Sequence, residues 1–272
     1  MNRRPGPGPQ RSRRPPVLVV ATASLTVAFL AVPLIGLLTK VSWGTLWQDL
    51  TTPVALDALK LSLVCSLWAT GLSLILGVPL AWVLARTQLP GRNLVRALAI
   101  LPMVLPPVVG GVALLLAFGR DGLLGRPLYS LFGIQFPFTT AGAVLAETFV
   151  AMPFLIITVE AALHSMDGRY EEAAANLGAG RWRTFRHVTL PIIAPSLIAG
   201  AALTWARALG EFGATITFAG NIQGRTQTLP LAVYLELQSN EGVAIAMSLA
   251  LLTFSIVVLV ALRGRWLGAI RR

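Results

Sequence analysis

Residues 58–85 read ALKLSLVCSLWATGLSLILGVPLAWVLA, and Lys60 is the one charged side chain in the run. A helix needs about 20 mostly apolar residues to cross a bilayer. Lipid offers no partner for backbone N–H and C=O groups, so only helices and closed barrels can span it. The run is continuously apolar rather than alternating, which favours the helix. This stretch therefore predicts a transmembrane helix.

The same pattern recurs along the chain, and the whole composition agrees with it. Of the 272 residues, 55% are hydrophobic and 12% are charged, with a mean hydropathy of +0.73. A soluble domain carries about 25% charged residues, so this chain has too little charge to cover a soluble globule. We predict an all-α integral membrane protein of about six transmembrane helices, at residues 17–39, 58–85, 94–118, 138–163, 191–218 and 243–262.

The distribution of basic residues predicts the orientation. A net charge of +11 would suggest nucleic-acid binding in a soluble protein, but basic residues of membrane proteins collect in cytoplasmic loops. With the N-terminus inside, 16 of the 22 Lys and Arg residues fall in inside segments, and Arg207 lies in a span. Both termini are expected in the cytoplasm, with residues 1–16 a disordered basic tail and residues 263–272 a second basic tail.

Helix breakers interrupt two of the predicted spans. Pro106 and Pro107 lie in the third, and Gly210 and Gly213 lie in the fifth. A broken backbone is tolerated at membrane depth where it is buried in protein or lines a wet cavity. The alternative for the third span is a kinked helix with no part in transport.

The longest inside loop, residues 164–191, reads HSMDGRYEEAAANLGAGRWRTFRHVTLP. Early carboxylates followed by alanines predict a helix, and Gly178 can end it in a positive-φ conformation. A second short helix over residues 180–188 would carry Trp182 and Phe185 on one face. Two interpretations stay open: a helix on the membrane surface, or a docking element for a cytoplasmic partner.

The spacing in this loop resembles the EAA motif of ABC importer permeases. Glu172-Ala173-Ala174 is followed after three residues by Gly178, and after nine more by the string VTLP, residues 188–191. The family favours Ile where this chain has Val188. The resemblance implies that the loop docks on a separate ATP-binding subunit, through Glu171, Glu172, Ala173, Ala174, Gly178, Trp182, Phe185, Leu190 and Pro191.

Residues 56–262 are similar to molybdate permeases in particular. The resemblance rests on GEFGAT at residues 210–215, FAGN at 218–221, TQTLPLA at 226–232 and LPMVLPP at 101–107. Sulfate and thiosulfate permeases share the GEFG-type segment and remain an alternative, and tungstate is not distinguished from molybdate. The candidate pathway or gate residues are Pro106, Pro107, Arg207, Gly210, Glu211, Gly213, Thr215 and Asn221.

This family resemblance implies a type I importer fold in a bacterial inner membrane. The expected partners are a second copy of the permease, two ATPase subunits and an extracytoplasmic oxyanion-binding protein. The two lysines, Lys40 and Lys60, lie in no phosphate-binding G-x-x-x-x-G-K-[ST] loop. We therefore expect no ATPase activity and no cofactor in this chain, with ATP and Mg²⁺ bound by the partner subunit.

Arg207 and Glu211 stand four residues apart, so a helix would place them on one face. Charges within a span are expensive and usually face the bundle interior, so the pair either fixes packing or lies beside the translocation path. Glu147 keeps an ion-coupled secondary transporter open as another class. A membrane enzyme is disfavoured, because the single Cys65 and two distant histidines give no metal-ligand spacing.

Overall fold

The computed structural model describes residues 16–270, and the side chains of residues 16–261, as a purely helical chain. Residues 1–15 and 271–272, where most of the N-terminal tail and the end of the C-terminal tail are predicted, lie outside the described residues. The chain divides into two compact units, residues 1–41 and 42–272, and each is described by itself.

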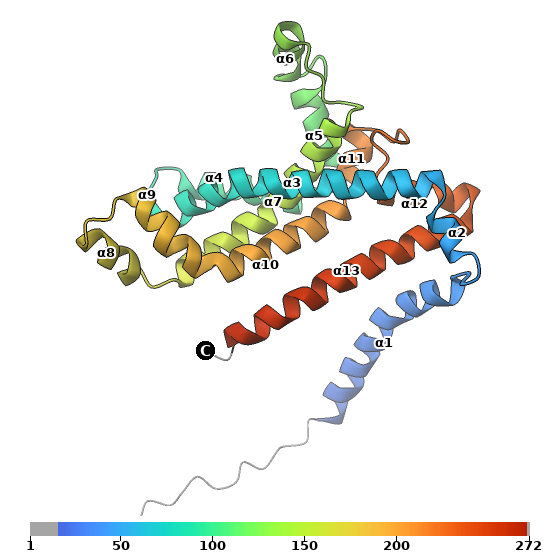
Figure 1. Cartoon of the computed structure of the whole chain (residues 1–272), viewed down its shortest axis with the longest axis horizontal. Helices are drawn as coiled ribbons and strands as arrows, with labels where there is room; N and C mark the ends of the chain where they lie inside the picture. Colours follow the sequence, from blue (N-terminus) through green and yellow to red (C-terminus); the bar gives the residue numbers. More distant parts are fainter. Residues whose placement is uncertain (1–15, 271–272) are drawn as a thin grey trace, which may run out of the picture. The chain divides into compact units, whose positions relative to one another are not determined.

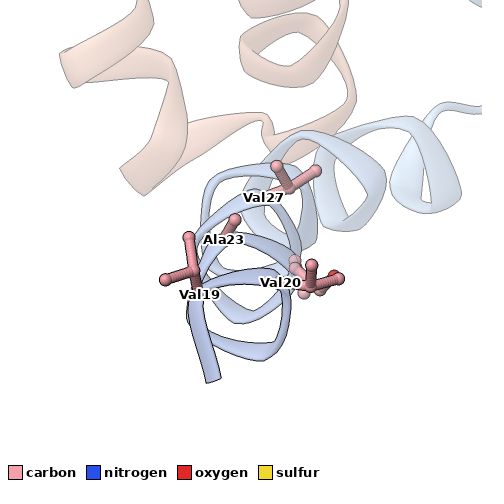
Figure 2. Close-up of a pocket in the computed structure, with 6 residues that line it drawn as sticks. Val19, Val20, Ala23 and Val27 are labelled. Atoms are coloured by element: carbon pink, nitrogen blue, oxygen red, sulfur yellow. The ribbon is translucent and has the colours of Figure 1, made fainter. Parts of the chain in front are cut away.

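The described part of the first unit is one helix, α1 (Val17–Lys40), whose bounds agree with those of the first predicted span to within one residue. None of its residues is buried within the chain. Figure 2 shows Val19, Val20, Ala23 and Val27 projecting from this helix, and the face that they form is lined by α1 residues alone. An exposed helix that is apolar on every side is what a lipid-facing span requires.

The second unit contains the remaining helices (Figure 1). In chain order they are α2 (Leu46–Leu50), α3 (Pro53–Arg86), α4 (Arg92–Val104), α5 (Pro107–Phe118), α6 (Gly125–Phe132), α7 (Thr140–Ser165), α8 (Arg169–Asn176), α9 (Arg181–Thr184), the π-helical turn η1 (Phe185–Thr189), α10 (Leu190–Leu209), α11 (Gly213–Phe218), α12 (Leu229–Ser239) and α13 (Glu241–Ile270). The expected spans at 58–85, 138–163 and 243–262 correspond to α3, α7 and α13, and α13 continues beyond the predicted end.

The core of this unit lies where α3 crosses α7 and α10. Leu84 of α3, Leu155 and Val159 of α7, and Ile193 of α10 belong to one buried cluster. Small residues bring the helices together, as in other membrane bundles. A Cβ atom built on Gly77 of α3 would lie 3.3 Å from the Ile156 side chain. This tight crossing holds the C-terminal ends of α3 and α7 beside the start of α10.

The third predicted span, residues 94–118, is not one helix. Helices α4 and α5 meet at an angle of 119° across Leu105 and Pro106, and both residues have extended backbone conformations. Pro106 and Pro107 each lack an N–H donor, and each disfavours helical geometry in the residue before it. Within residues 16–270, five helices are therefore long and apolar enough to span a membrane, or six if this bent pair counts as one span.

The fifth span is shifted from the predicted 191–218. Helical structure runs from Arg181 to Leu209 as one candidate span, and residues 213–218 form the separate helix α11. The early start arises because η1 joins α9 to α10 without a break. The early end falls at Gly210, and Phe212 then takes a non-helical conformation with φ −129° and ψ −56°.

The two broken segments pack against each other through glycines. A Cβ atom on Gly111 of α5 would stand 2.7 Å from Thr217 Cβ and 2.9 Å from the carbonyl oxygen of Ala214. A Cβ atom on Gly213 would stand 2.8 Å from Cβ of Pro107. Glycine is therefore required on both sides of this contact, since any larger residue would separate α5 from α11.

We predict that Gly111→Ala destabilises the permease, because the added methyl group meets backbone and a β-branched side chain. Overpacking of this kind costs about 1–3 kcal/mol. The measurement is the melting temperature of the detergent-purified chain. Gly71→Ala on α3 is the control, since a Cβ atom there has nothing within 4 Å. Equal melting temperatures for the two variants would contradict the close contact.

Candidate functional site

The loop between α7 and α10 folds as the sequence predicts, into a helix, a glycine turn and a second helix. Asp167 accepts a hydrogen bond from the backbone N–H of Arg169 (3.0 Å) at the start of α8. At the other end, Gly178 has φ +81° and donates to Ala175, while Ala179 donates to Ala174. This pair of bonds is a Schellman motif, which explains why a glycine stands at residue 178.

Glu171 fastens α8 to the membrane-spanning helices. Its Oε2 atom lies 3.0 Å from Nε of Arg86, the last residue of α3. Its Oε1 atom accepts a hydrogen bond of 2.6 Å from the hydroxyl of Thr189, which is fully buried at the start of α10. One carboxylate thus joins α8, α3 and η1. A movement of α8 would therefore be transmitted to α3 and, through η1, to α10.

The opposite side of α8 is open. Glu172 is exposed, as is Ala173, whereas Ala174 is half-buried. Leu177 is 90% exposed and Tyr170 is 58% exposed. Apolar side chains this open on a polar helix indicate a surface that another molecule covers.

The second helix of the loop carries the expected aromatic residues on one side. Phe185 stacks on Trp182 at 5.7 Å between ring centroids and meets the edge of Trp82 of α3 at 6.3 Å. Trp182 is 71% exposed, and Phe185 is half-buried. Downstream, Leu190 is half-buried and Pro191 is exposed in the first turn of α10.

Arg207 and Glu211 form the ion pair that the sequence suggests, although not on one helix. Arg207 Nη2 lies 2.7 Å from Glu211 Oε2, and the Glu211 side chain is 1% exposed. Glu211 follows the end of α10, and its Oε1 atom accepts a hydrogen bond of 2.8 Å from the N–H of Ala214. The carboxylate therefore caps α11 while it holds Arg207, so it bridges the break between α10 and α11.

The other pathway candidates are only partly brought together. Pro107 and Gly213 touch across the contact between α5 and α11, whereas Pro106 and Gly210 are exposed. Thr215 is fully buried, and its hydroxyl has no hydrogen-bond partner. Asn221 lies beyond α11 and has a buried carbonyl oxygen, Oδ1, that also lacks one. Buried polar atoms without partners are unusual. At these positions a ligand, or the backbone after a rearrangement, could supply the missing hydrogen bond.

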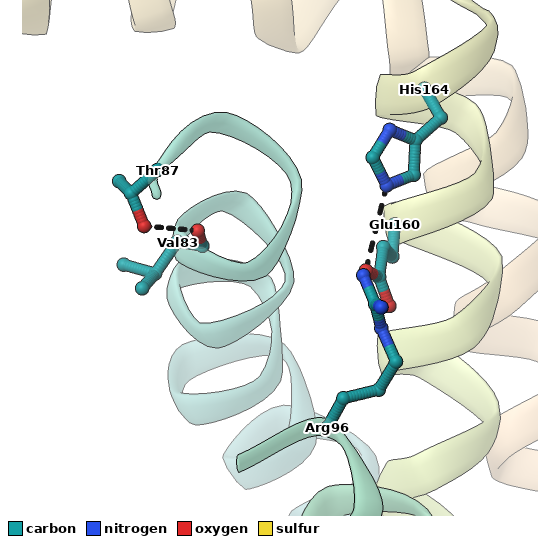
Figure 3. Close-up of polar contacts among 5 residues, drawn as sticks. All are labelled: Val83, Thr87, Arg96, Glu160 and His164. Carbon is teal, nitrogen blue, oxygen red and sulfur yellow. Dashed lines mark hydrogen bonds and ion pairs between the residues drawn. The ribbon is translucent and has the colours of Figure 1, made fainter. Parts of the chain in front are cut away.

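One ionic cluster escaped the sequence analysis (Figure 3). Glu160 of α7 accepts hydrogen bonds from both Nε (3.0 Å) and Nη2 of Arg96 on α4, and His164 Nε2 lies 3.5 Å from the same carboxylate. The cluster joins the N-terminal part of α4 to the C-terminal part of α7. A carboxylate inside a predicted span was the available signal, since such a charge needs a partner. Across the described residues, no group of three His, Cys, Asp or Glu side chains could hold a metal ion.

Comparison with known proteins shows which family matches this chain and which permeases are similar to it. The model of a family described as the binding-protein-dependent transport system inner membrane component matches residues 77–268. The molybdenum transport system permease protein ModB of Mycobacterium tuberculosis is 44% identical over 250 residues, covering 92% of this chain and 94% of that protein. The sulfate transport system permease protein CysT of Escherichia coli is 38% identical, covering 93% and 96%.

The fold has a solved counterpart. The crystal structure of a bacterial ABC transporter involved in the import of the acidic polysaccharide alginate contains a chain that superposes with a TM-score of 0.69. The two chains are 22% identical, and 94% of each is covered. The helical fold described above is therefore similar to that of ABC importer permeases.

We predict that Arg207→Met destabilises the permease, because it leaves the Glu211 carboxylate buried without its cation. Removing one partner of a buried pair costs about 3–5 kcal/mol, and partial exposure of Arg207 puts the cost at about 3 kcal/mol or less. The double variant Arg207→Met/Glu211→Gln removes both charges and keeps an acceptor for Ala214, so it should regain most of the lost melting temperature. Failure of the double variant to recover would contradict the pairing, and Arg225→Met in an exposed loop is the control.

Proposed function

Because the chain belongs to the family of inner membrane components of binding-protein-dependent transport systems, we propose that it forms the translocation path of an ATP-driven importer for molybdate. The family has no catalytic site of its own and binds no cofactor, so the ATP is hydrolysed by a separate subunit. The proposal concerns how this chain is coupled to that subunit and which anion it passes.

The observation that carries the coupling proposal is the two-sided construction of α8. Its inner side is held by Glu171 to Arg86 and Thr189, and its outer side exposes Glu172, Tyr170 and Leu177. A helix that is anchored on one side and open on the other transmits the motion of whatever binds the open side. We assign that role to the ATPase subunit, with Glu172 and Leu177 in the contact.

The proposed assembly has two permease copies, two ATPase subunits and an extracytoplasmic binding protein. ATP binding closes the ATPase dimer and draws the two α8 helices together, and Glu171 passes this movement to α3 and α10. The spans then rock from an inward-open to an outward-open state, and the binding protein releases its anion into the cavity. Such a transition needs an element with two stable arrangements.

Two features support an oxyanion as the cargo. The first is the similarity to the molybdenum transport permease, at 44% identity over nearly the full chain. The second is Arg207, a partly exposed cation beside the break between α10 and α11. Its ion pair with Glu211 keeps anion affinity weak, which suits a path that must release its cargo. Sulfate is the competing candidate because a sulfate permease is 38% identical.

We predict that Glu172→Lys and Gly178→Leu each lower ATP-dependent uptake at least tenfold. The first variant reverses the charge of the docking face, and the second places a side chain where φ is +81°, which costs about 1–2 kcal/mol and distorts the turn. The measurement is uptake into cells or proteoliposomes, with co-purification of the ATPase subunit as a second readout.

The control for these variants is Gly180→Ala, at a glycine two residues away with φ −66° and no atom within 4 Å of a built Cβ. This change should leave uptake and subunit association unaltered. Normal uptake in both Glu172→Lys and Gly178→Leu would remove the docking proposal.

The cargo is tested by uptake of labelled molybdate in cells that express this permease with its ATPase and binding-protein partners. We expect excess unlabelled molybdate or tungstate to compete, because the two anions have nearly the same size and charge, and sulfate to compete at least tenfold less well. Stronger competition by sulfate would reassign the importer to sulfate.

A further inference from the structure

Two adjoining hollows lie at the C-terminal end of α3, beside α8 and α9. The first is an apolar cleft of about 370 Å³, lined by Pro79, Trp82, Val83, Arg181, Trp182 and Phe185. The second is a more polar cavity of about 490 Å³ that shares Trp82, Arg181 and Phe185 with the cleft. The polar cavity also has Arg86, Thr87, Glu171, Thr184 and Thr189 in its wall. Together they make one site with an apolar end and a polar end.

The two ends lie in the order that a bilayer imposes. Arg86 is the last residue of α3. Pro79 and Trp82 precede it by about 10 Å and 6 Å along the helix axis, at 1.5 Å per residue. The facing wall belongs to α9 and η1, which begin the candidate span Arg181–Leu209. We therefore expect the apolar cleft at the level where acyl chains meet headgroups, a depth that tryptophan favours. The polar cavity lies on the cytoplasmic side of it.

The aromatic side chains that line the cleft are only partly covered by other residues of the chain. Phe185 packs against both Trp82 and Trp182, yet the Trp182 side chain remains 71% exposed. An indole ring held open by a stacked neighbour at this depth offers an apolar surface to a chain lying beside it.

The polar cavity contains a cation with an unused donor. The Nε and Nη2 atoms of Arg86 are both buried and neither has a hydrogen-bond partner, although Nε lies 3.0 Å from Oε2 of Glu171 in an ion pair. A buried donor without an acceptor is destabilising, so an acceptor is expected there. Arg181 adds an exposed positive charge that borders both hollows. A phosphate group would satisfy both side chains.

We propose that this site binds one anionic phospholipid of the cytoplasmic leaflet. The acyl chain lies in the cleft against Trp82 and Trp182, and the phosphate lies in the polar cavity between Arg86 and Arg181. Basic pockets between spans on the cytoplasmic side are suited to anionic headgroups. The lipid would brace the coupling loop against α3 without touching the exposed face of α8 that carries Glu172.

The test uses the full-length permease in nanodiscs that contain phosphatidylcholine with a minor fraction of phosphatidylglycerol. Native mass spectrometry of the released protein counts the lipids retained. We expect about one phosphatidylglycerol per permease copy, in preference to phosphatidylcholine. Arg181→Gln should weaken retention about fivefold, which corresponds to the loss of about 1 kcal/mol. Trp182→Ala should also lower retention, because it removes the open wall of the cleft.

Matched controls come from the same chain. Trp68→Ala removes a tryptophan of α3 that is 65% exposed, and Arg126→Gln removes an exposed arginine of α6. Both should retain the lipid as the wild type does. Equal retention of the two lipids by the wild type, or unchanged retention in both Arg181→Gln and Trp182→Ala, would overturn the proposal.

A photoreactive phosphatidylglycerol locates the site in the permease purified with its ATPase partner. Crosslinks to peptides that contain Trp82 or Trp182 are expected. If these residues instead crosslink to the ATPase subunit or to a second permease copy and not to lipid, a protein covers the hollows and the lipid assignment is wrong. The result is independent of whether α8 docks on the ATPase, since Glu172→Lys should leave lipid retention unchanged.

Discussion

A backbone inside lipid has to satisfy its own hydrogen bonds, and this requirement governs the places where the chain stops being helical. Both interruptions fall inside predicted spans, at Leu105–Pro106 and at residues 210–212. At the first, the two prolines remove donors that would otherwise be orphaned. At the second, Glu211 supplies an acceptor to Ala214. The helices after the breaks, α5 and α11, then pack together through Gly111 and Gly213, which leaves little room for anything but backbone.

The coupling loop separates two tasks between neighbouring carboxylates. Glu171 is turned inward and bonded to Arg86 and Thr189, whereas Glu172 is turned outward and free. Successive residues of an α-helix point about 100° apart around its axis. One carboxylate can therefore anchor the helix while its neighbour faces a partner. The sequence motif draws attention to Glu172, but the mechanical link to the spans depends on Glu171. This division would let a helix of eight residues transmit movement to the spans in the coupling role that we propose for it.

The sequence alone predicted most of the helices and the build of the loop, because hydropathy and glycine position act locally. Gly178 ends α8 where a C-terminal glycine should, and α3 and α7 follow their apolar runs closely. The errors arose where tertiary contacts decide. Nothing local says that η1 would join α9 to α10, or that α11 would turn away from α10. Likewise, the partnership of Glu160 with Arg96 spans 64 residues, and its geometry comes only from the packing of α4 on α7.

The candidate site shows the same division and bears on how selectivity arises. The ion pair of Arg207 with Glu211 could be foreseen from spacing, but not that Glu211 would also cap α11. An anion that drew Arg207 away would leave Glu211 holding a helix end with an unbalanced charge in a dry environment. If the pair lines the path, as we propose, that cost opposes tight binding of any dianion, and we expect the described spans to pass an oxyanion rather than to select one. In the proposed importer, we therefore expect discrimination between molybdate and sulfate to be made before the anion reaches this chain, by the binding protein that delivers it.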